Sequence, residues 1–302
     1  MDTPPLAGRC ADTTQHHRSD DARHALDAVA PWLTCPHCAG PLCRHTRIMR
    51  CRCGHTFDIA RTGHLSLLPG RRRHRGDTPA MVAAREAFLA GDHYRPLRST
   101  ITALTVEHAP AGIRLVVDLA GGTGHYLAPV LDALPAAHGM TVDLSTAALR
   151  RAARSHSRAA AIAADVWAPL PLATGSTGVA LSVFGPRNPQ EVERILTGDG
   201  ILLVASARPE HLHELRTRIG GIGVDPHKAA RHRAAFTGFV PVTRQVVQWR
   251  LALHPDEAAA LASMGPNAHH RIPDPDAEVV QAELPDLVGV TAAMDVVVYR
   301  RR

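Results

Sequence analysis

Short apolar runs alternate with segments of helical periodicity along most of the chain after residue 109. Apolar runs bounded by turn residues are typical of buried strands, whereas apolar residues spaced three and four apart are typical of helices packed on them. The pattern therefore predicts an α/β fold with a doubly wound, seven-stranded sheet. The predicted strands are Leu115–Val117, Gly139–Leu144, Ala159–Ala164, Val179–Phe184, Gly200–Ala205, Val246–Leu253 and Val288–Tyr299.

The first predicted strand ends in an acid, Asp118, and runs into the turn A-G-G-T-G-H-Y, which contains Gly121, Gly122 and Gly124. Glycine lets the backbone approach a ligand because no Cβ stands in the way. The dinucleotide fingerprint G-x-G-x-x-G would need a small third residue where this chain has Leu127. The turn therefore favours S-adenosylmethionine (SAM) over NAD, although alone it also fits another nucleotide or a plain turn.

Two further predicted strands also end in acids, Asp143 and Asp165. A carboxylate after the second strand is where a ribose diol is usually bound, and one after the third can accept from the adenine amino group. Each acid alone is more often a helix cap or a turn residue. Because three successive strands end in acids beside the glycine turn, the sequence predicts a SAM site. Its expected residues are Asp118, Ala120, Gly121, Gly122, Gly124, His125, Tyr126, Asp143, Asp165 and Val166.

The fourth predicted strand runs into a loop that contains G-P-R-N-P. Ligands of such sheets bind at the carboxyl ends of the strands. We therefore expect Phe184, Pro186, Arg187 and Asn188 to line the pocket for the group that is methylated. No general base stands out: His125, His211 and His269 are candidates, and each could equally be structural.

All six cysteines lie in the first 53 residues, which indicates a local metal site rather than disulfides spread over a secreted fold. Cys35 and Cys38 have the spacing of a zinc knuckle, and Cys51, Cys53 and His55 form a second one. The sequence predicts a zinc ion bound by Cys35, Cys38, Cys51 and His55, with Cys53 in place of His55 as the alternative.

The same segment is strongly basic, with nine arginines against one acid, Asp58, between Cys35 and Arg75. Beside a zinc module, this charge predicts a nucleic-acid-binding appendage, although a run such as Arg71–Arg73 alone would suit a solvated loop. The expected units are a disordered extension (1–30), a zinc-binding RNA-recognition domain (31–75), a helical linker (76–108) and a SAM-dependent domain (109–302). No apolar run is long enough to span a membrane, which predicts a soluble cytoplasmic protein.

From Leu33 onward the chain resembles the RlmA/TlrB family of 23S rRNA guanine-N1-methyltransferases. The matching stretches are C-P-H-C with C-R-C-G-H-T-F-D, A-R-T-G-H-L-S-L-L-P, G-D-T-P-A-M-V-A-A-R, H-Y-R-P-L, D-L-A-G-G-T-G-H, A-D-V-W-A-P-L-P-L, V-F-G-P-R-N-P-Q-E and M-G-P. The chain departs from the family at Ala120, which replaces a glycine, at D-H-Y in place of G-H-Y, and at His269, where the family tends to have tryptophan.

The resemblance implies a class I SAM-methyltransferase with a zinc domain that binds rRNA, and a homodimer. The R-N-P loop and the G-G-T-G-H turn look closer to the TlrB branch, which implies methylation of guanosine 748 in hairpin 35 and resistance to tylosin-type macrolides. The housekeeping branch, which acts at position 745, is the alternative. Two other functions remain open: a SAM-dependent methyltransferase of a small natural product, and a zinc-dependent RNA-binding protein that no longer binds SAM.

Overall fold

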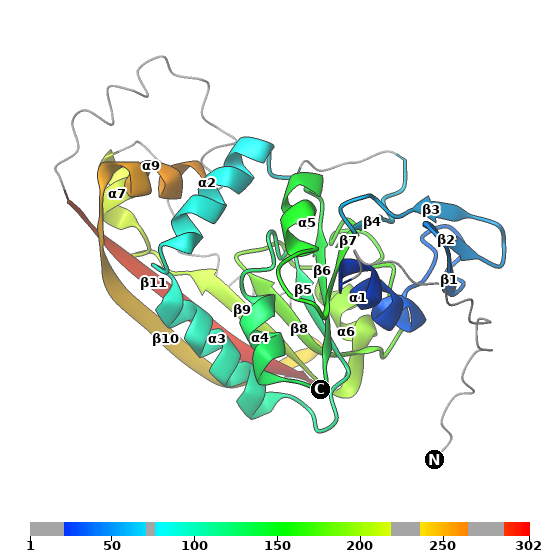
Figure 1. The fold of residues 1–302 in the computed structure, drawn as a ribbon. Coiled ribbons are helices and arrows are strands. Elements are labelled where there is room, and N and C mark those ends of the chain that lie inside the picture. Colours follow the sequence, from blue (N-terminus) through cyan, green and yellow to red (C-terminus); the bar gives the residue numbers. More distant parts are fainter. Residues whose placement is uncertain (1–20, 71–75, 219–235, 265–286) are drawn as a thin grey trace.

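The computed structural model describes residues 21–70, 76–218, 236–264 and 287–302, and its main feature is one eight-stranded sheet (Figure 1). The strand order is β10-β11-β9-β8-β5-β6-β7-β4. All seven predicted strands are confirmed, and β4 is an eighth that the sequence pattern did not reveal. The strands are β4 (Leu65–Ser66), β5 (Leu115–Leu119), β6 (His138–Asp143), β7 (Ala159–Ala163), β8 (Thr177–Val183), β9 (Leu196–Ala207), β10 (Phe239–Leu253) and β11 (Val288–Arg301).

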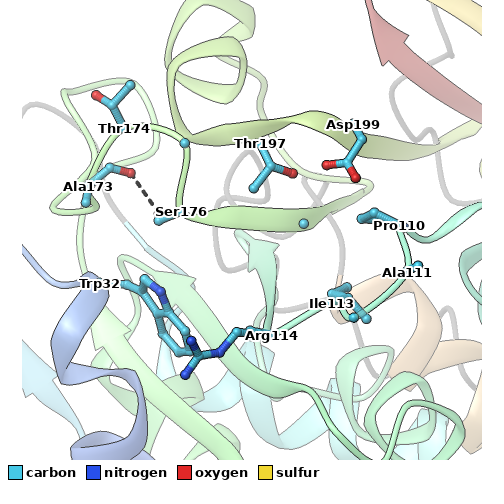
Figure 2. A pocket seen from close by; sticks show the side chains of 13 residues that line it. Trp32, Pro110, Ala111, Ile113, Arg114, Ala173, Thr174, Ser176, Thr197 and Asp199 are labelled. Atoms are coloured by element: carbon cyan, nitrogen blue, oxygen red, sulfur yellow. Dashed lines mark hydrogen bonds between the residues drawn. The ribbon is translucent and has the colours of Figure 1, made fainter. Parts of the chain in front are cut away.

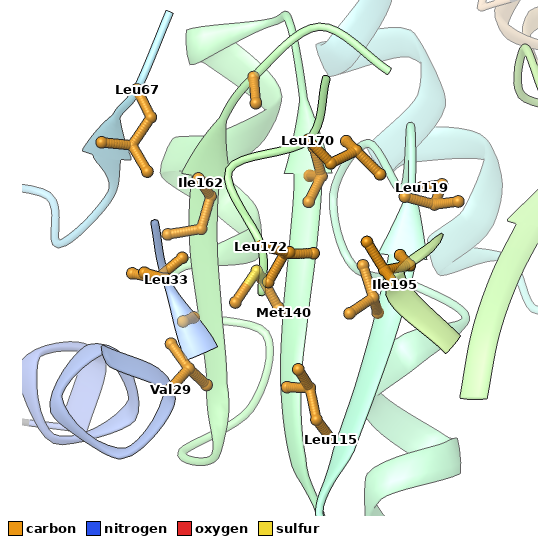
Figure 3. Packing of buried hydrophobic residues seen from close by; sticks show 14 of the residues in the cluster. Val29, Leu33, Leu67, Leu115, Leu119, Met140, Ile162, Leu170, Leu172 and Ile195 are labelled. Atoms are coloured by element: carbon orange, nitrogen blue, oxygen red, sulfur yellow. The ribbon is translucent and has the colours of Figure 1, made fainter. Parts of the chain in front are cut away.

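Strands β4 to β9 run parallel, whereas β11 is antiparallel to both β9 and β10. Helices cover both faces, so the central strands are buried on both sides and read as continuous apolar runs. On β7, Ala160 and Ile162 pack in the cluster that contains Leu33, while Ala161 and Ala163 pack with Leu149 on the other face. Figure 3 shows part of the first cluster.

The helices form two layers around this sheet. Helices α3 to α5 lie on one face, and α1 and α6 lie on the other, while α2 packs against α5 and α9. Their bounds are α1 (Asp21–Val29), α2 (Pro79–Ala90), α3 (Arg95–His108), α4 (Leu127–Ala133), α5 (Thr146–Ala152), α6 (Pro189–Ile195), α7 (His213–Arg218) and α9 (Pro255–Ser263), and a short 3-10 helix spans Ala30–Trp32. Among the described residues, no helix is both long and apolar enough to cross a membrane.

Helix α1 corrects the expectation that residues 1–30 lack fixed structure. Ala25, Leu26 and Val29 are buried, and α1 packs against β6 and β7. A nine-residue helix is marginal by itself in water, so its stability comes from this docking and not from its sequence alone. The expectation is wrong for residues 21–29, and residues 1–20 lie outside the described part of the chain.

Two expected boundaries also differ from the structure. Helix α3 is part of the main core rather than a linker, because Leu97, Ile101 and Leu104 are buried in the cluster that includes β5 and β11. Strand β4 comes from the expected zinc-binding domain, yet it pairs in parallel with β7, Leu65 opposite Ile162. The zinc-binding segment is therefore joined to the sheet through main-chain hydrogen bonds.

Candidate functional site

A three-stranded antiparallel sheet of β1 (Leu42–His45), β2 (Ile48–Cys51) and β3 (Thr56–Asp58) brings the two knuckles together. The ligand atoms of Cys35, Cys38, Cys51 and His55 all lie within 4.8 Å of one another. The Nδ1 atom of His55 is 3.5 Å from Cys35 Sγ and 3.3 Å from Cys51 Sγ, and the Sγ atoms of Cys38 and Cys51 are 3.6 Å apart. Tetrahedral zinc with ordinary bond lengths separates its ligand atoms by roughly 3.4–3.8 Å, so this donor set fits the ion.

The chain turns sharply at both knuckles. Ala39 has a φ of 55° and Gly54 a φ of 87°, and the amide of His37 donates to Cys35 Sγ at 3.4 Å. Cys53, the alternative ligand, interacts with Cys38 and Cys51 but is exposed. The structure therefore gathers the four residues of the first choice, with Cys53 at their edge.

The glycine turn lies where the order of the strands reverses, between β5 and β8. In doubly wound sheets this switch point, at the carboxyl ends of the strands, is where ligands bind. A Cβ at Gly121 would lie 2.5 Å from the carboxyl group of Asp118, and one at Gly124 would lie 2.6 Å from Ser155 Oγ. Ala120 has a φ of 55°, in the left-handed region. This conformation costs a residue with a side chain about 1 kcal/mol, because its Cβ lies close to the following carbonyl oxygen.

Asp118 is fully buried, and neither of its carboxyl oxygens has a hydrogen-bond partner among the described residues. Burial, with a smaller contribution from the charge of Asp143, raises its pKa to about 8. A buried carboxyl group without partners is costly. The site therefore suits a ligand that brings a cationic donor, such as the ammonium group of SAM.

Asp143 lies beside it at the end of β6. Its Oδ2 accepts from the amide of Gly122 at 2.9 Å, and its Oδ1 accepts from the amide of Ser145 at 2.7 Å. Burial nevertheless raises its pKa, although these two hydrogen bonds oppose the shift. Each carboxylate oxygen retains a second lone pair, so Asp143 can still accept from a ribose diol.

The remaining expected cofactor residues surround the same edge of the sheet. Asp165 is half-buried and accepts from the amide of Trp167 at 3.0 Å, and Val166 is buried beside it. His125 packs edge-on against the buried Tyr126, and burial lowers the pKa of His125 to about 4. His125 is therefore neutral at physiological pH.

The loop after β8 brings Phe184 to the surface at this switch point. Phe184 has a φ of 58°, is 41% exposed, and stacks on His211 with the ring centroids 5.9 Å apart. Next to it, a Cβ at Gly185 would lie 3.0 Å from the Cβ of Ala120. The loop is thus pressed against the glycine turn, close to the expected cofactor site.

The other loop residues are less exposed than Phe184, and Asn188 makes hydrogen bonds. Asn188 caps α6 by accepting from the amide of Glu191 at 3.4 Å, and its side-chain amide donates to the carbonyl of Trp167 at 3.3 Å. Pro186 is half-buried. Arg187 is half-buried too, and desolvation lowers its pKa to about 10.

Sequence reasoning missed Tyr94, which lies in H-Y-R-P-L and was given no role. Tyr94 is buried, and its hydroxyl lies 3.4 Å from Nε2 of His211. The amide of Ala293 donates to Nδ1 of His211, so Nε2 carries the proton of the neutral ring and donates to Tyr94. Because both ring nitrogens are engaged, and burial lowers the pKa of His211 to about 4, this histidine is not placed to act as a base. His269 lies outside the described residues.

A separate cavity of about 350 Å³ lies at the opposite edge of the sheet (Figure 2). It is lined by residues that precede β5 and β8, among them Arg114 and Thr174, and by Trp32, over which the Arg114 guanidinium lies at 5.6 Å. This edge holds the amino ends of the strands. The cavity is therefore distinct from the switch point, where the acids and the glycine turn meet.

A doubly wound sheet with a glycine turn and strand-end acids at its switch point, joined to a four-residue Cys/His cluster, defines a class I SAM-dependent methyltransferase with a zinc ribbon. The family described as RlmA, N-terminal, matches residues 33–75. The 23S rRNA (guanine(748)-N(1))-methyltransferase of Streptomyces fradiae is 42% identical over 274 residues, which cover 90% of this chain and 98% of that protein. A Micromonospora griseorubida protein named as a 23S rRNA (guanine-N(1)-)-methyltransferase is 43% identical, with the same coverage. This chain belongs to the family of 23S rRNA (guanine-N1)-methyltransferases.

Among solved structures, a SAM-dependent methyltransferase from Anabaena variabilis is similar to this chain with a TM-score of 0.47 and 13% identity. The match covers 76% of this chain and 98% of that one.

Proposed function

We propose that this protein transfers a methyl group from SAM to N1 of guanosine 748 in hairpin 35 of 23S rRNA, and that it thereby protects ribosomes against tylosin-type macrolides. The observation that carries the proposal is that the glycine turn, which follows the buried Asp118, and the exposed ring of Phe184 lie at one switch point. The relative from Streptomyces fradiae, whose name specifies guanine 748, supports the position. Because the substrate is ribosomal RNA, we place the protein in the cytoplasm.

In this proposal, different residues bind the three parts of the cofactor. Asp118 and the amides of the glycine turn hold the methionine end, Asp143 holds the ribose, and Asp165 and Val166 hold the adenine. SAM supplies the methyl group as an electrophile on its sulfonium sulfur. The protein's own contribution is to position the acceptor, because alignment of the reacting atoms supplies much of the rate in such transfers.

Phe184 is the proposed platform for the target base. A base that is modified at its Watson–Crick edge must leave the helical stack and be held against another surface. One face of the Phe184 ring stacks on the buried His211, which leaves the exposed part of the ring for a guanine. Arg187 and Asn188 follow Phe184 by three and four residues in the same loop, and they can hydrogen-bond the O6 or N2 edge of the guanine. With His125 half-buried, His211 buried and both rings neutral, we assign the N1 proton to solvent rather than to a general base.

The zinc ribbon is the proposed RNA grip, with a zinc ion bound by Cys35, Cys38, Cys51 and His55. Arg44 is paired with Asp27, but the three other arginines between β1 and β3 are exposed. These ribbon arginines are Arg47, Arg50 and Arg52. Their guanidinium groups suit phosphate oxygens, so RNA affinity should reside mainly in the ribbon and methyl transfer in the sheet domain. We also propose a homodimer, which light scattering on the purified protein tests.

Primer extension on 23S rRNA treated with protein and SAM tests the function. N1-methylguanine blocks reverse transcription, so a new stop should appear at the nucleotide on the 3′ side of position 748. A stop for position 745 would assign the protein to the housekeeping reaction. No stop with either naked rRNA or whole ribosomal subunits as substrate would refute the proposal.

The Phe184→Ala variant tests the platform. We expect it to bind SAM normally and to lose most methyl transfer. Val242→Ala is a matched control, because Val242 is 43% exposed but lies on β10 at the far edge of the sheet. If both variants methylate rRNA equally well, the target base is held elsewhere.

A further inference from the structure

Arg85 on α2, the last residue of the stretch G-D-T-P-A-M-V-A-A-R, lies over the glycine turn, although it is not among the residues expected to form the SAM site. A Cβ built on Gly122 would lie 3.2 Å from Nη1 of Arg85. The guanidinium forms an ion pair with Asp77 through Nη1, and Nη2 donates to the carbonyl of Met264 at 2.8 Å. The side chain is 25% exposed, so it borders the site without being sealed in the core.

Acidic groups dominate this part of the molecule. Asp118 and Asp143 lie at the ends of β5 and β6, and Asp77 reaches the same place because its carbonyl accepts from Ser145 Oγ at 2.7 Å. Arg85 interacts electrostatically with both Asp143 and Tyr126. The acids suit the ammonium group and the ribose of SAM, but they would repel its carboxylate. A cationic donor beside Gly122 removes that conflict.

The guanidinium also has donors to spare. It carries five N–H groups in a planar fork, and the structure describes one partner at Nη1 and one at Nη2. A fork of this kind binds a carboxylate through two parallel hydrogen bonds, which a lysine cannot reproduce. Arg85 can therefore keep its hydrogen bond to the Met264 carbonyl while its guanidinium binds a second carboxylate.

We propose that Arg85 binds the α-carboxylate of SAM, opposite Asp118, which binds its ammonium group. This inference rests on the proposed function, since it deepens the same cofactor site. Through its hydrogen bond to Met264, the residue that follows α9, the same guanidinium would connect the cofactor to the helix beside β10.

The rival reading is that Arg85 is only structural and serves to hold Asp77. A second arginine offers a control for the loss of charge. Arg98 on α3 also influences Tyr126, but its Nη2 lies 2.7 Å from Asp92 Oδ1, and it has no contact with Gly122 among those described.

Calorimetry with two nucleosides on the full-length protein tests the proposal. S-adenosylhomocysteine carries the amino-acid end, and 5′-methylthioadenosine lacks it. Arg85→Gln should weaken binding of S-adenosylhomocysteine roughly tenfold to a hundredfold, as expected for a lost hydrogen bond to a charged group, and should leave binding of methylthioadenosine nearly unchanged. Arg85→Lys should recover only part of the loss. Arg98→Gln should affect both nucleosides equally little.

Asp77→Asn separates the two readings. If Arg85 serves the cofactor, this variant keeps the preference for S-adenosylhomocysteine over methylthioadenosine, whereas a purely structural pair predicts the same loss as in Arg85→Gln. Equal weakening of both nucleosides by Arg85→Gln, no weakening of either, or a selective loss in Arg98→Gln would overturn the inference. If the wild-type protein binds neither nucleoside, the proposed function itself fails.

Discussion

Replacing Asp118 by asparagine should stabilise the ligand-free protein at neutral pH while it removes affinity for SAM. The two side chains have nearly the same shape, so the substitution leaves the contact with Gly121 unchanged. What it removes is an ionisable group whose pKa rises from 3.8 to about 8 on folding.

The sign follows from proton linkage. A carboxyl group whose pKa is raised in the folded state binds its proton more tightly there than in the unfolded chain. Its contribution to stability is therefore complete below the unfolded pKa and is lost as the pH rises toward the folded one. One pKa unit corresponds to about 1.4 kcal/mol, so between about pH 4 and pH 7 Asp118 alone should remove about 4 kcal/mol from the free energy of unfolding.

Urea unfolding of both proteins across this range measures the effect. Below the unfolded pKa of Asp118 both side chains are neutral and the two proteins should be similarly stable. The difference in favour of Asp118→Asn should then grow with pH. Other carboxyl groups, such as Glu214 with its pKa lowered to about 2, contribute equally to both proteins and cancel.

Calorimetry with SAM supplies the second half of this test. The ammonium group should ionise Asp118 on binding, so wild-type protein near neutral pH should release roughly one proton, detected as heats that differ between buffers. The variant should bind SAM weakly and release none. Equal pH dependence of stability in both proteins, or unimpaired SAM binding by the variant, would refute the reasoning.

Three other changes test the rest of the architecture. Cys38→Ser should lower the zinc content of the purified protein well below one ion per chain, whereas Cys53→Ser should retain it; elemental analysis decides, and the reverse result would make Cys53 a ligand. Leu26→Ala should reduce the free energy of unfolding by about 2–5 kcal/mol, because it opens a cavity under α1, and an unchanged urea midpoint would mean that α1 is not docked in solution. Changing the three ribbon arginines together to alanine should weaken rRNA binding and flatten its salt dependence by somewhat under one logarithmic unit per lost phosphate contact, with SAM affinity intact; a normal salt titration would place the RNA grip elsewhere.

The sequence by itself determined the features that local pattern encodes. Runs such as Ala159–Ala163 identify strands buried on both faces, and the glycines after Asp118 identify a tight turn at the end of a strand. The spacing of Cys35, Cys38, Cys51 and His55 identified the residues that the ribbon gathers. These signals survive in a sequence because each depends on residues close to one another along the chain.

Only the tertiary structure decided the features that depend on packing between distant segments. Helix α1 is too short to be stable alone. Its apolar residues Leu26 and Val29 stabilise it only because they are buried against β6 and β7. Strand β4 has two residues, and no periodicity can be read from so short a run. Arg85 ends a stretch that resembles the family, but the stretch does not reveal that the fold brings this side chain to the glycine turn and to Met264. Sequence patterns record which face of an element is apolar but not which element it meets.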